Sequence, residues 1–180
     1  WSSDVCSSDL ELSGPGVVER LRRLSPDLLL VCGAPVLAPA IFTVPRLGAV
    51  NLHHGVAPRY RGEDTLFWPL VRQDWDHLGV TLHYIDAGVD TGRVIAHGFP
   101  ARRGGEDEAD LWASAARLGA ELIHRFLRAC DSGAPPGRAQ EPGGKQYFRR
   151  ERTIAWDARH RALRLLGKVP PPSEERTVFY

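Results

Sequence analysis

The pattern of apolar and polar positions predicts strands that alternate with helices. Apolar residues at helical spacing predict a helix over residues 15–24. Continuous apolar runs at 27–32 and 48–53 have the length expected of strands buried on both faces. Two more strands are expected at 79–85 and 93–97, joined by a loop rich in Asp and Gly.

The predicted helices lie between and after these strands. A short helix is expected at 36–42 and another at 64–72, where Pro69 marks a kink or an early end. The clearest helix is predicted at 106–130, because its apolar residues form one stripe and acidic residues occupy its first turn. Strands alternating with helices indicate an α/β fold built on a layered sheet.

Composition divides the chain into three segments. Residues 1–10, WSSDVCSSDL, form a near-repeat without an apolar period, typical of a translated adapter sequence; the alternative is a natural polar segment. Because the 180-residue chain also contains no Met, we expect the natural sequence to start upstream. Residues 11–132 carry the alternating elements. Residues 133–180 form a tail rich in Pro, Gly and Arg, with a short strand expected at 146–148 and a helix near 156–166.

Charge and cysteine content are those of an ordinary globular chain. There are 23 Lys and Arg against 22 Asp and Glu; leaving out residues 1–10 removes two Asp, so 20 acidic residues remain. Cys32, within an apolar run, is expected to be a small core residue, and the cysteines have neither a disulfide nor a zinc spacing. No signal peptide and no apolar run of about 18 residues is found, so a cytoplasmic location away from membranes is expected.

Polar groups follow two of the predicted strands. In an open α/β sheet, functional groups gather beyond the carboxyl ends of the strands. Asn51 and His53 lie two residues apart at one strand end, so their side chains project to the same side. Asp90 lies in the loop after the next strand, so the three groups are expected to converge.

An amide, an imidazole and a carboxylate together suit acyl transfer to an amine. Attack on a formyl carbon forms a tetrahedral oxyanion, which Asn51 and a protonated His53 would hydrogen-bond. Asp90 would favour the imidazolium, orient the ring or help to remove a proton from the attacking amine.

Four motifs, in one order and spacing, carry a resemblance to a known family. They are Asn51-Leu52-His53, Pro58-Arg59-Tyr60-Arg61-Gly62, Gly79-Val80-Thr81 and Asp86-Ala87-Gly88-Val89-Asp90-Thr91-Gly92. From about residue 26 to residue 130 the chain resembles the 10-formyltetrahydrofolate-dependent formyltransferases, which include methionyl-tRNA, glycinamide ribonucleotide and sugar-amine formyltransferases. The resemblance implies a Rossmann-like formyltransferase fold with a mostly parallel sheet flanked by helices and incomplete at its N-terminus. Residues 11–132 would then be the C-terminal part of the catalytic domain.

The same resemblance implies roles for individual residues. Asn51, His53 and Asp90 would be the catalytic trio, 10-formyltetrahydrofolate the formyl donor, and no metal would be needed. The residues that would border the pterin of the folate are Pro35, Val36, Leu37, Asp86, Ala87, Gly88, Val89, Thr91 and Gly92. Many members have Ser two residues after the catalytic His, whereas this chain has Gly55. The family's N-terminal strands, which usually help to hold the acceptor, are missing from this sequence.

Several alternative interpretations stay open. His53, His54 and Asp90 could bind a metal, although adjacent His side chains on a strand diverge. His83 and His97 lie within predicted strands and are interpreted as packing or edge residues. The segment 59–61 is either a solvated turn or a brace for the active-site loop. The trio could also pass the formyl group to water, as a hydrolase does, or the domain could be a non-catalytic folate-binding scaffold.

The acceptor is the least determined part of the prediction. Six Arg residues between 149 and 164 could bind nucleic acid, which would favour a tRNA acceptor. Acidic residues dilute this cluster, and the tail is short for a tRNA-binding barrel. A small-molecule amine, such as an amino sugar or an amino-acid derivative, is therefore preferred. The sequence does not indicate an oligomeric state.

Overall fold

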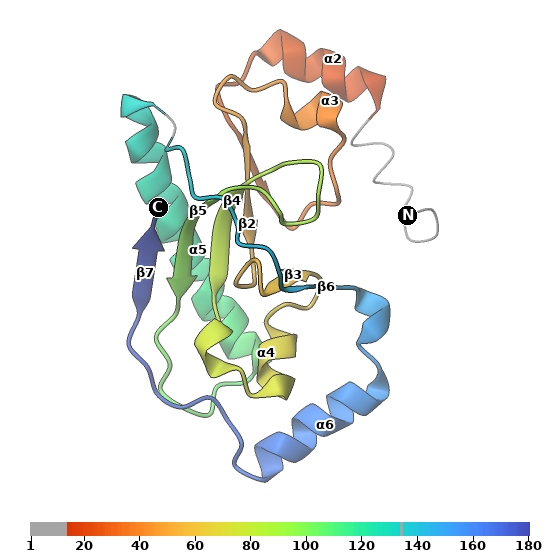
Figure 1. Cartoon of the computed structure of the whole chain (residues 1–180), viewed down its shortest axis with the longest axis vertical. Coiled ribbons are helices and arrows are strands. Elements are labelled where there is room, and N and C mark those ends of the chain that lie inside the picture. Colours follow the sequence, from red (N-terminus) through yellow and green to blue (C-terminus); the bar gives the residue numbers. More distant parts are fainter. Residues whose placement is uncertain (1–13, 134) are drawn as a thin grey trace.

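The computed structural model describes residues 14–133 and 135–180, which form a central mixed sheet with helices around it (Figure 1). The segment 1–10 lies outside the described residues. The strands are β1 (Leu29–Cys32), β2 (Ala49–His53), β3 (Tyr60–Gly62), β4 (Val80–Tyr84), β5 (Val94–Phe99), β6 (Lys145–Tyr147) and β7 (Arg176–Phe179). The α-helices are α2 (Pro15–Leu24), α3 (Pro39–Phe42), α4 (Phe67–Arg72), α5 (Glu108–Ala129) and α6 (Ile154–Leu165). Single 3-10 turns are η1 (Trp75–His77), η2 (Cys130–Ser132) and η3 (Arg149–Glu151).

The central sheet has five strands in the order β1-β2-β4-β5-β7. β1 and β2 run parallel, whereas each later neighbour is antiparallel to the strand beside it. The α/β fold class is confirmed. The expectation of a mostly parallel sheet is wrong for the central sheet, in which three of the four described strand pairs are antiparallel. A parallel pair needs a crossover of a dozen or more residues, and the short loop between β4 and β5 contains no such element.

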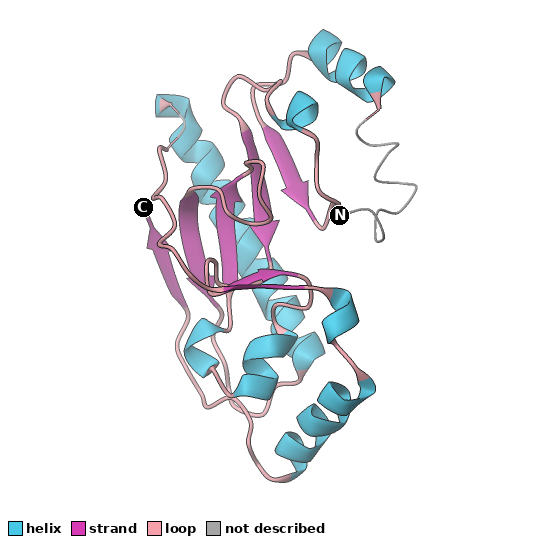
Figure 2. Ribbon diagram, turned by 45° about the vertical axis from the view of Figure 1, so that its right-hand side comes forward, coloured by secondary structure: helices cyan, strands magenta, loops and turns pink. Residues whose placement is uncertain are grey.

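Helix α5 covers one face of the sheet (Figure 2). Its apolar stripe packs on the sheet in one core cluster, which includes Val50, Leu52, Val80, Leu82, Ala96, Ala115, Leu122 and Phe126. The helix begins at a capping box, in which Asp107 accepts from Asp110 N at 2.9 Å and Asp110 accepts from Asp107 N at 3.1 Å. Gly119 allows the close approach, because a Cβ there would lie 2.4 Å from the Leu52 side chain. The predicted helix at 106–130 is confirmed.

The segment after Ser132 contributes to the fold at two places. β6 pairs with β3 in a small parallel sheet, and β7 forms the edge of the central sheet. Helix α6 packs against α4, where the Trp68 ring lies 4.8 Å from Tyr147 and 5.5 Å from Trp156. The strand expected at 146–148 and the helix expected near 156–166 are present with shifted ends, whereas β3 and β7 were not predicted.

Strand β1 differs from its prediction as a strand buried on both faces. Its burial alternates, with Leu30 42% exposed and Cys32 also exposed. β1 is an edge strand that pairs only with β2 among the described strands, and the exposed side chains alternate along it. The expectation that Cys32 is a core residue is therefore wrong. Within the described ranges, no helix combines the length and the apolar character that a membrane span requires.

Candidate active site

The central sheet has one apolar face and one polar face. On β2, Val50 and Leu52 pack toward α5, so Asn51 and His53 project to the opposite side. The antiparallel register places Asn51 opposite His83 and His53 opposite Thr81 on β4. Because directly opposed residues share a face, these four polar side chains gather on the side of the sheet away from α5.

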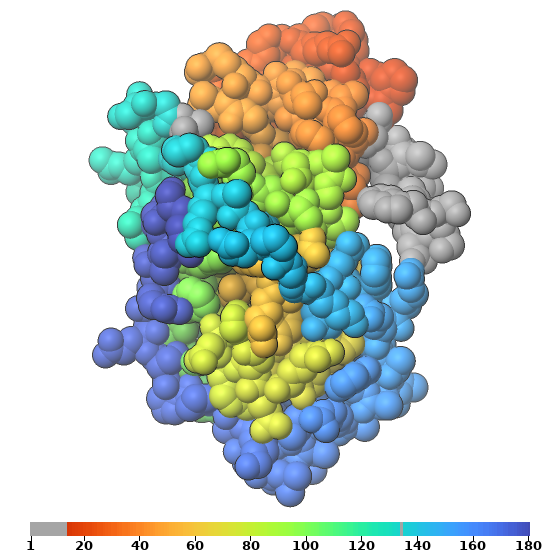
Figure 3. Space-filling model, viewed as in Figure 1, coloured from red at the N-terminus to blue at the C-terminus, as the bar shows by residue number. Residues whose placement is uncertain are grey.

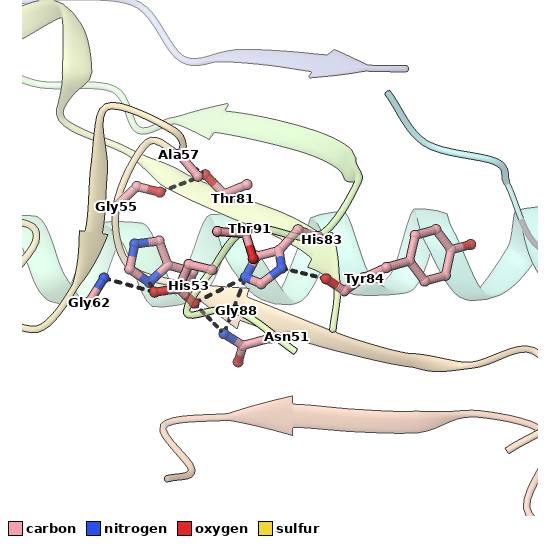
Figure 4. A network of polar contacts seen from close by, with 12 residues as sticks. Asn51, His53, Gly55, Ala57, Gly62, Thr81, His83, Tyr84, Gly88 and Thr91 are labelled. Atoms are coloured by element: carbon pink, nitrogen blue, oxygen red, sulfur yellow. Dashed lines mark hydrogen bonds and ion pairs between the residues drawn. The ribbon is translucent and has the colours of Figure 1, made fainter. Parts of the chain in front are cut away.

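Asp90 completes this polar cluster. Its Oδ1 accepts from Asn51 Nδ2 at 3.2 Å, and its Oδ2 lies 3.4 Å from His53 Nδ1. Figure 4 shows Asn51, His53 and His83 directed toward one another from β2 and β4. The predicted convergence of Asn51, His53 and Asp90 is thus present in the structure.

The route by which Asp90 arrives differs from the expected one. Because β4 is antiparallel to β2, the loop after Tyr84 leaves the sheet beside Val50, at the beginning of β2. The loop then folds back along the polar face to reach Asn51 and His53. The carboxyl ends of β2 and β4 therefore do not meet at one edge, and Asp90 reaches the site through the path of its loop.

His83 belongs to the same cluster, although its place within a strand suggested a packing residue. Its Nε2 lies 3.2 Å from Asp90 Oδ1 and 3.4 Å from Asn51 Nδ2, and the residue is only 2% exposed. The interpretation as a packing residue is incomplete, because this ring makes polar contacts with two candidate catalytic residues. The only signal in the sequence was the alternation along β4, which puts His83 on the face of Thr81.

The motif at 58–62 braces both His53 and Asp90. The Tyr60 carbonyl accepts from His53 Nε2 at 2.9 Å, and Gly62 N donates to Asp90 Oδ2 at 2.8 Å. Gly62 has φ of +89°, and a Cβ there would lie 2.2 Å from the Tyr147 carbonyl oxygen, so this position requires glycine. Of the two interpretations of residues 59–61, these contacts favour the brace.

The chain after His53 is tied to β4 and β5. Thr81 Oγ1 donates to the Gly55 carbonyl at 2.6 Å and accepts from Ala57 N at 3.0 Å. From β5, His97 Nε2 contacts the Ala57 carbonyl at 2.9 Å, so His97 helps to fix this segment. Gly55 leaves no room for a side chain, since a Cβ there would lie 2.6 Å from His53 Nε2. A Ser at this position would not fit this arrangement unchanged.

The surroundings of the site lower the pKa of both Asp90 and His53. Burial alone would raise the pKa of Asp90, but the nearby His53 and His83 and the Gly62 N–H outweigh it and hold that pKa well below its usual range. Burial lowers the pKa of His53, because desolvation penalises the imidazolium, although Asp90 and the Tyr60 carbonyl act in the opposite direction. A carbonyl only accepts, so His53 carries a proton on Nε2, and its Nδ1 faces the carboxylate.

The loop from Asp86 to Gly92 is closed by its own polar contacts. Asp86 Oδ1 accepts from Gly88 N at 3.0 Å and from Thr91 Oγ1 at 2.6 Å, while Ala87 is exposed and Val89 partly exposed. Gln140 Nε2 fastens the loop by donating to the Asp90 and Gly92 carbonyls, each at 2.8 Å.

Residues 135 and 137 contact residues on either side of this loop. Tyr84 Oη donates to the Pro135 carbonyl, and Arg93 Nη2 donates to the Gly137 carbonyl at 2.7 Å. Residues 135–140, which supply these contacts and that of Gln140, are called the strap below. The strap crosses the last residue of β4 and the start of β5. Sequence reasoning did not predict this strap, because a Pro- and Gly-rich segment carries no periodic signal.

The segment Pro35, Val36 and Leu37 follows the carboxyl end of β1. Cys32 of β1 is the register partner of Leu52, so this segment leaves the sheet beside the strand end that carries His53. Val36 is 46% exposed. The loop at 86–92 and the region around β1 and α3 are visible on the same face of the molecule, coloured green and orange (Figure 3).

The alternative metal site is not assembled. The His54 ring stacks on Trp112 of α5 at 4.9 Å, on the opposite side of the sheet from Asp90. Among residues 14–133 and 135–180, no group of three or more His, Cys, Asp or Glu side chains is arranged to hold a metal ion.

An amide, an imidazole and a carboxylate meet on the polar face of the α/β sheet, and comparison with known proteins identifies the family of the chain. Residues 8–127, more than half of the chain, match the formyl transferase family. The chain therefore belongs to the formyltransferase family.

Individual relatives agree with this assignment. The chain is 29% identical over 168 residues to the methionyl-tRNA formyltransferase of Syntrophus aciditrophicus (strain SB), covering 89% of the chain and 54% of the relative. It is 34% identical over 134 residues to that of Trichlorobacter lovleyi (strain ATCC BAA-1151 / DSM 17278 / SZ), covering 74% of the chain and 42% of the relative. The chain thus spans about half the length, or less, of these two relatives.

Solved structures share the fold at lower identity. The formyltransferase PseJ from Anoxybacillus kamchatkensis, in complex with UDP-4,6-dideoxy-4-formamido-L-AltNAc and tetrahydrofolate, superposes with a TM-score of 0.63 at 24% identity. That match covers 79% of this chain and 77% of PseJ. HypX from Aquifex aeolicus in complex with tetrahydrofolic acid gives a TM-score of 0.64 at 19% identity, covering 79% of this chain and 26% of HypX.

Proposed function

We propose that this chain carries the chemistry for transferring a formyl group from 10-formyltetrahydrofolate to the amine of a small-molecule acceptor, such as an amino sugar or an amino-acid derivative. The observation that carries the proposal is the shared contact of Asn51 and His53 with one partly buried carboxylate, Asp90. In this proposal residues 11–132 supply the catalytic part, and Asn51, His53 and Asp90 are the catalytic residues.

The proposed step is an acyl transfer between two nitrogen atoms. The amine nitrogen bonds to the formyl carbon, the bond from that carbon to N10 of the folate breaks, and the proton lost by the amine ends on N10. Asn51 donates an N–H to the oxyanion of the tetrahedral intermediate. His53 Nδ1 receives the amine proton, and Asp90 stabilises the imidazolium so formed.

The geometry of His53 supports this division of roles. Its Nε2 is held by the Tyr60 carbonyl at 2.9 Å, whereas the 3.4 Å separation of Nδ1 from Asp90 exceeds an ordinary hydrogen bond. Nδ1 is therefore the ring atom that can turn toward a reacting group. Catalytic hydrogen bonds are often long until substrate is bound, so this looseness is compatible with catalysis.

The proposed donor site uses the loop at 86–92 and the segment at 35–37. Fixing the loop by Asp86 and Gln140 gives it a defined backbone before any ligand arrives. PseJ and HypX have structures with a bound tetrahydrofolate, which supports a folate donor for a chain of the same fold. We propose that the pterin lies between these two segments.

The preference for a small acceptor rests on how the Arg residues of the tail are used. Arg152 makes paired contacts with Glu108 at 2.9 and 3.0 Å, and Arg164 Nη1 donates to the Glu106 carbonyl at 2.8 Å. Arg159 Nε donates to the Val71 carbonyl at 3.2 Å. These three guanidinium groups bind within the protein, so they form a weaker nucleic-acid surface than the sequence suggested.

A tRNA acceptor is the second candidate. The observation in its favour is that relatives at 29% and 34% identity are methionyl-tRNA formyltransferases. The chain spans only part of those relatives.

A single assay compares these possibilities. The purified protein is incubated with 10-formyltetrahydrofolate and, separately, with nucleotide-linked amino sugars, amino-acid derivatives or charged initiator tRNA. Tetrahydrofolate release is followed together with the mass of the acceptor. We expect an increase of one formyl group on a small amine, with a His53→Ala variant that binds folate but does not turn over. His124→Ala, on the exposed side of α5, is the matched control and should keep wild-type turnover.

The alternative outcomes are distinct. Formylation of tRNA without formylation of small amines would replace the proposed acceptor. Release of formate without any amine would identify a hydrolase. Folate binding with no turnover under any condition would indicate a scaffold, and turnover by His53→Ala equal to wild type would reject the assigned site.

A further inference from the structure

His83 is held rigidly beside the proposed catalytic residues. The ring is 2% exposed, and its Nδ1 lies 2.7 Å from the carbonyl oxygen of Tyr84. Because that oxygen only accepts, Nδ1 carries a proton. The ring orientation is therefore fixed from the backbone of β4, with Nε2 directed away from that carbonyl.

The fixed Nε2 atom meets two residues at once. It lies 3.4 Å from Asn51 Nδ2 and 3.2 Å from Asp90 Oδ1, and those two atoms are themselves 3.2 Å apart. When Nε2 is unprotonated it accepts from Asn51, and when it is protonated it donates to Asp90. In both states a hydrogen bond with His83 limits how one of the two side chains can turn.

We infer that His83 is a positioning residue, which sets the direction of the Asn51 amide and the Asp90 carboxylate in the proposed formyl transfer. With Asp90 Oδ1 occupied by Asn51 and His83, the other oxygen, Oδ2, is the one presented to His53 and Gly62. His83 therefore acts through its neighbours and makes no contact with the reacting atoms. The catalytic consequence rests on the proposed function; the geometric consequence does not.

The charged groups around His83 make this role measurable. Asp90 faces it from the loop, and the His53 ring lies 6.3 Å away, edge to face, on β2. His97 on β5 also interacts with it electrostatically. A positive charge on His83 lowers the pKa of His53, so the titration of His53 reports on His83 directly.

The experiment compares His83→Leu, which fills the space without a polar contact, with His83→Gln, which retains a group able to accept and donate. Turnover is measured with 10-formyltetrahydrofolate and the best amine, and nitrogen-15 NMR follows the Asn51 amide and the His53 ring across pH. We expect His83→Leu to lose about 10- to 100-fold in kcat with little change in the KM for the donor, as for a small misplacement of reacting groups. His83→Gln should recover most of the loss.

The NMR signals distinguish a positioning role from simple filling of space, because a residue that only fills space would leave these signals unchanged when it is replaced by Leu. In His83→Leu the Asn51 amide signals should shift and the pKa of His53 should rise, whereas His124→Gln should leave both unchanged. Asn51 and His53 signals at wild-type positions in His83→Leu would overturn the inference, as would equal impairment of the Leu and Gln variants. If the wild-type protein transfers no formyl group, the proposed function fails, and the NMR comparison still decides the role of His83.

Discussion

Asn51 and His83 face each other across β2 and β4, and the loop that carries Asp90 returns over this pair so that one carboxylate oxygen lies 3.2 Å from both side chains. Such a buried cluster is stable only if each polar group has a partner, because burial of an unpaired polar group is costly. Asp90 meets this condition by accepting from Asn51 and from Gly62 N as well as facing both imidazoles. The Asp90 carboxylate therefore links all the polar side chains of the cluster, and its replacement is the most direct test of the site.

Removing the charge of Asp90 should affect both turnover and acid stability. We expect Asp90→Asn to lower turnover by about 10²- to 10⁴-fold, the range of general acid–base catalysis. Because the folded state lowers the pKa of Asp90, its ionised form adds stability above the unfolded pKa of about 3.9, and this stability is lost as pH falls through the folded pKa. Denaturant unfolding should show Asp90→Asn less stable than wild type at pH 7.

The difference between the two proteins should narrow as the pH is lowered from about 4. Asp131→Asn, at an exposed position in η2, is the matched control and should keep the wild-type pH dependence. A constant difference in the free energy of unfolding from pH 7 to pH 2 would contradict the assignment of Asp90 as a carboxylate stabilised by folding.

Gly55 tests how tightly the loop fits around His53. A Cβ at this position would lie 2.6 Å from His53 Nε2 and 2.6 Å from Thr65 Cβ, so Gly55→Ser must displace one of them. We expect a loss of about 1–3 kcal/mol in the free energy of unfolding, as for other overpacked sites, and a changed His53 ring signal. Gly16→Ser in α2, where nothing lies within 4 Å, should cost less and leave His53 unchanged. An unperturbed His53 in Gly55→Ser would refute the close fit.

Gln140 tests the strap over the proposed donor loop. Gln140→Ala removes both hydrogen bonds to the Asp90 and Gly92 carbonyls, at about 0.5–1.5 kcal/mol each. Amide hydrogen exchange should accelerate across residues 86–92 while α5 keeps its protection. Glu141→Ala is the control, since its pairing with Arg138 is at an exposed position and such pairs contribute little. Equal exchange rates in the two variants would show that the strap does not order the loop.

The sequence predicted the elements with strong periodicity and the chemistry attached to them. The apolar stripe of α5 fits only a helix and the short apolar run of β2 fits a buried strand, so both elements were predictable. The convergence of Asn51, His53 and Asp90 was also predicted. The direction of β4 relative to β2 was not predictable, because apolar alternation along β4 is the same for parallel and antiparallel pairing. The direction of β5 was predictable in principle, because the short loop expected between the two strands leaves no room for a parallel crossover. His83 had no distinguishing signal: a His within a strand has one pattern whether it faces a core or a site.

The strap at 135–140 joins distant parts of the chain into one functional unit. The last of the four sequence motifs ends at Gly92, yet Gln140, Pro135 and Gly137 supply hydrogen-bond partners to residues in and beside these motifs. A fragment ended at Ser132 would keep every motif residue and would lose these partners together with the edge strand β7. A shortened or transferred domain designed from the motifs alone would therefore retain the side chains of the site without the backbone contacts that set their spacing.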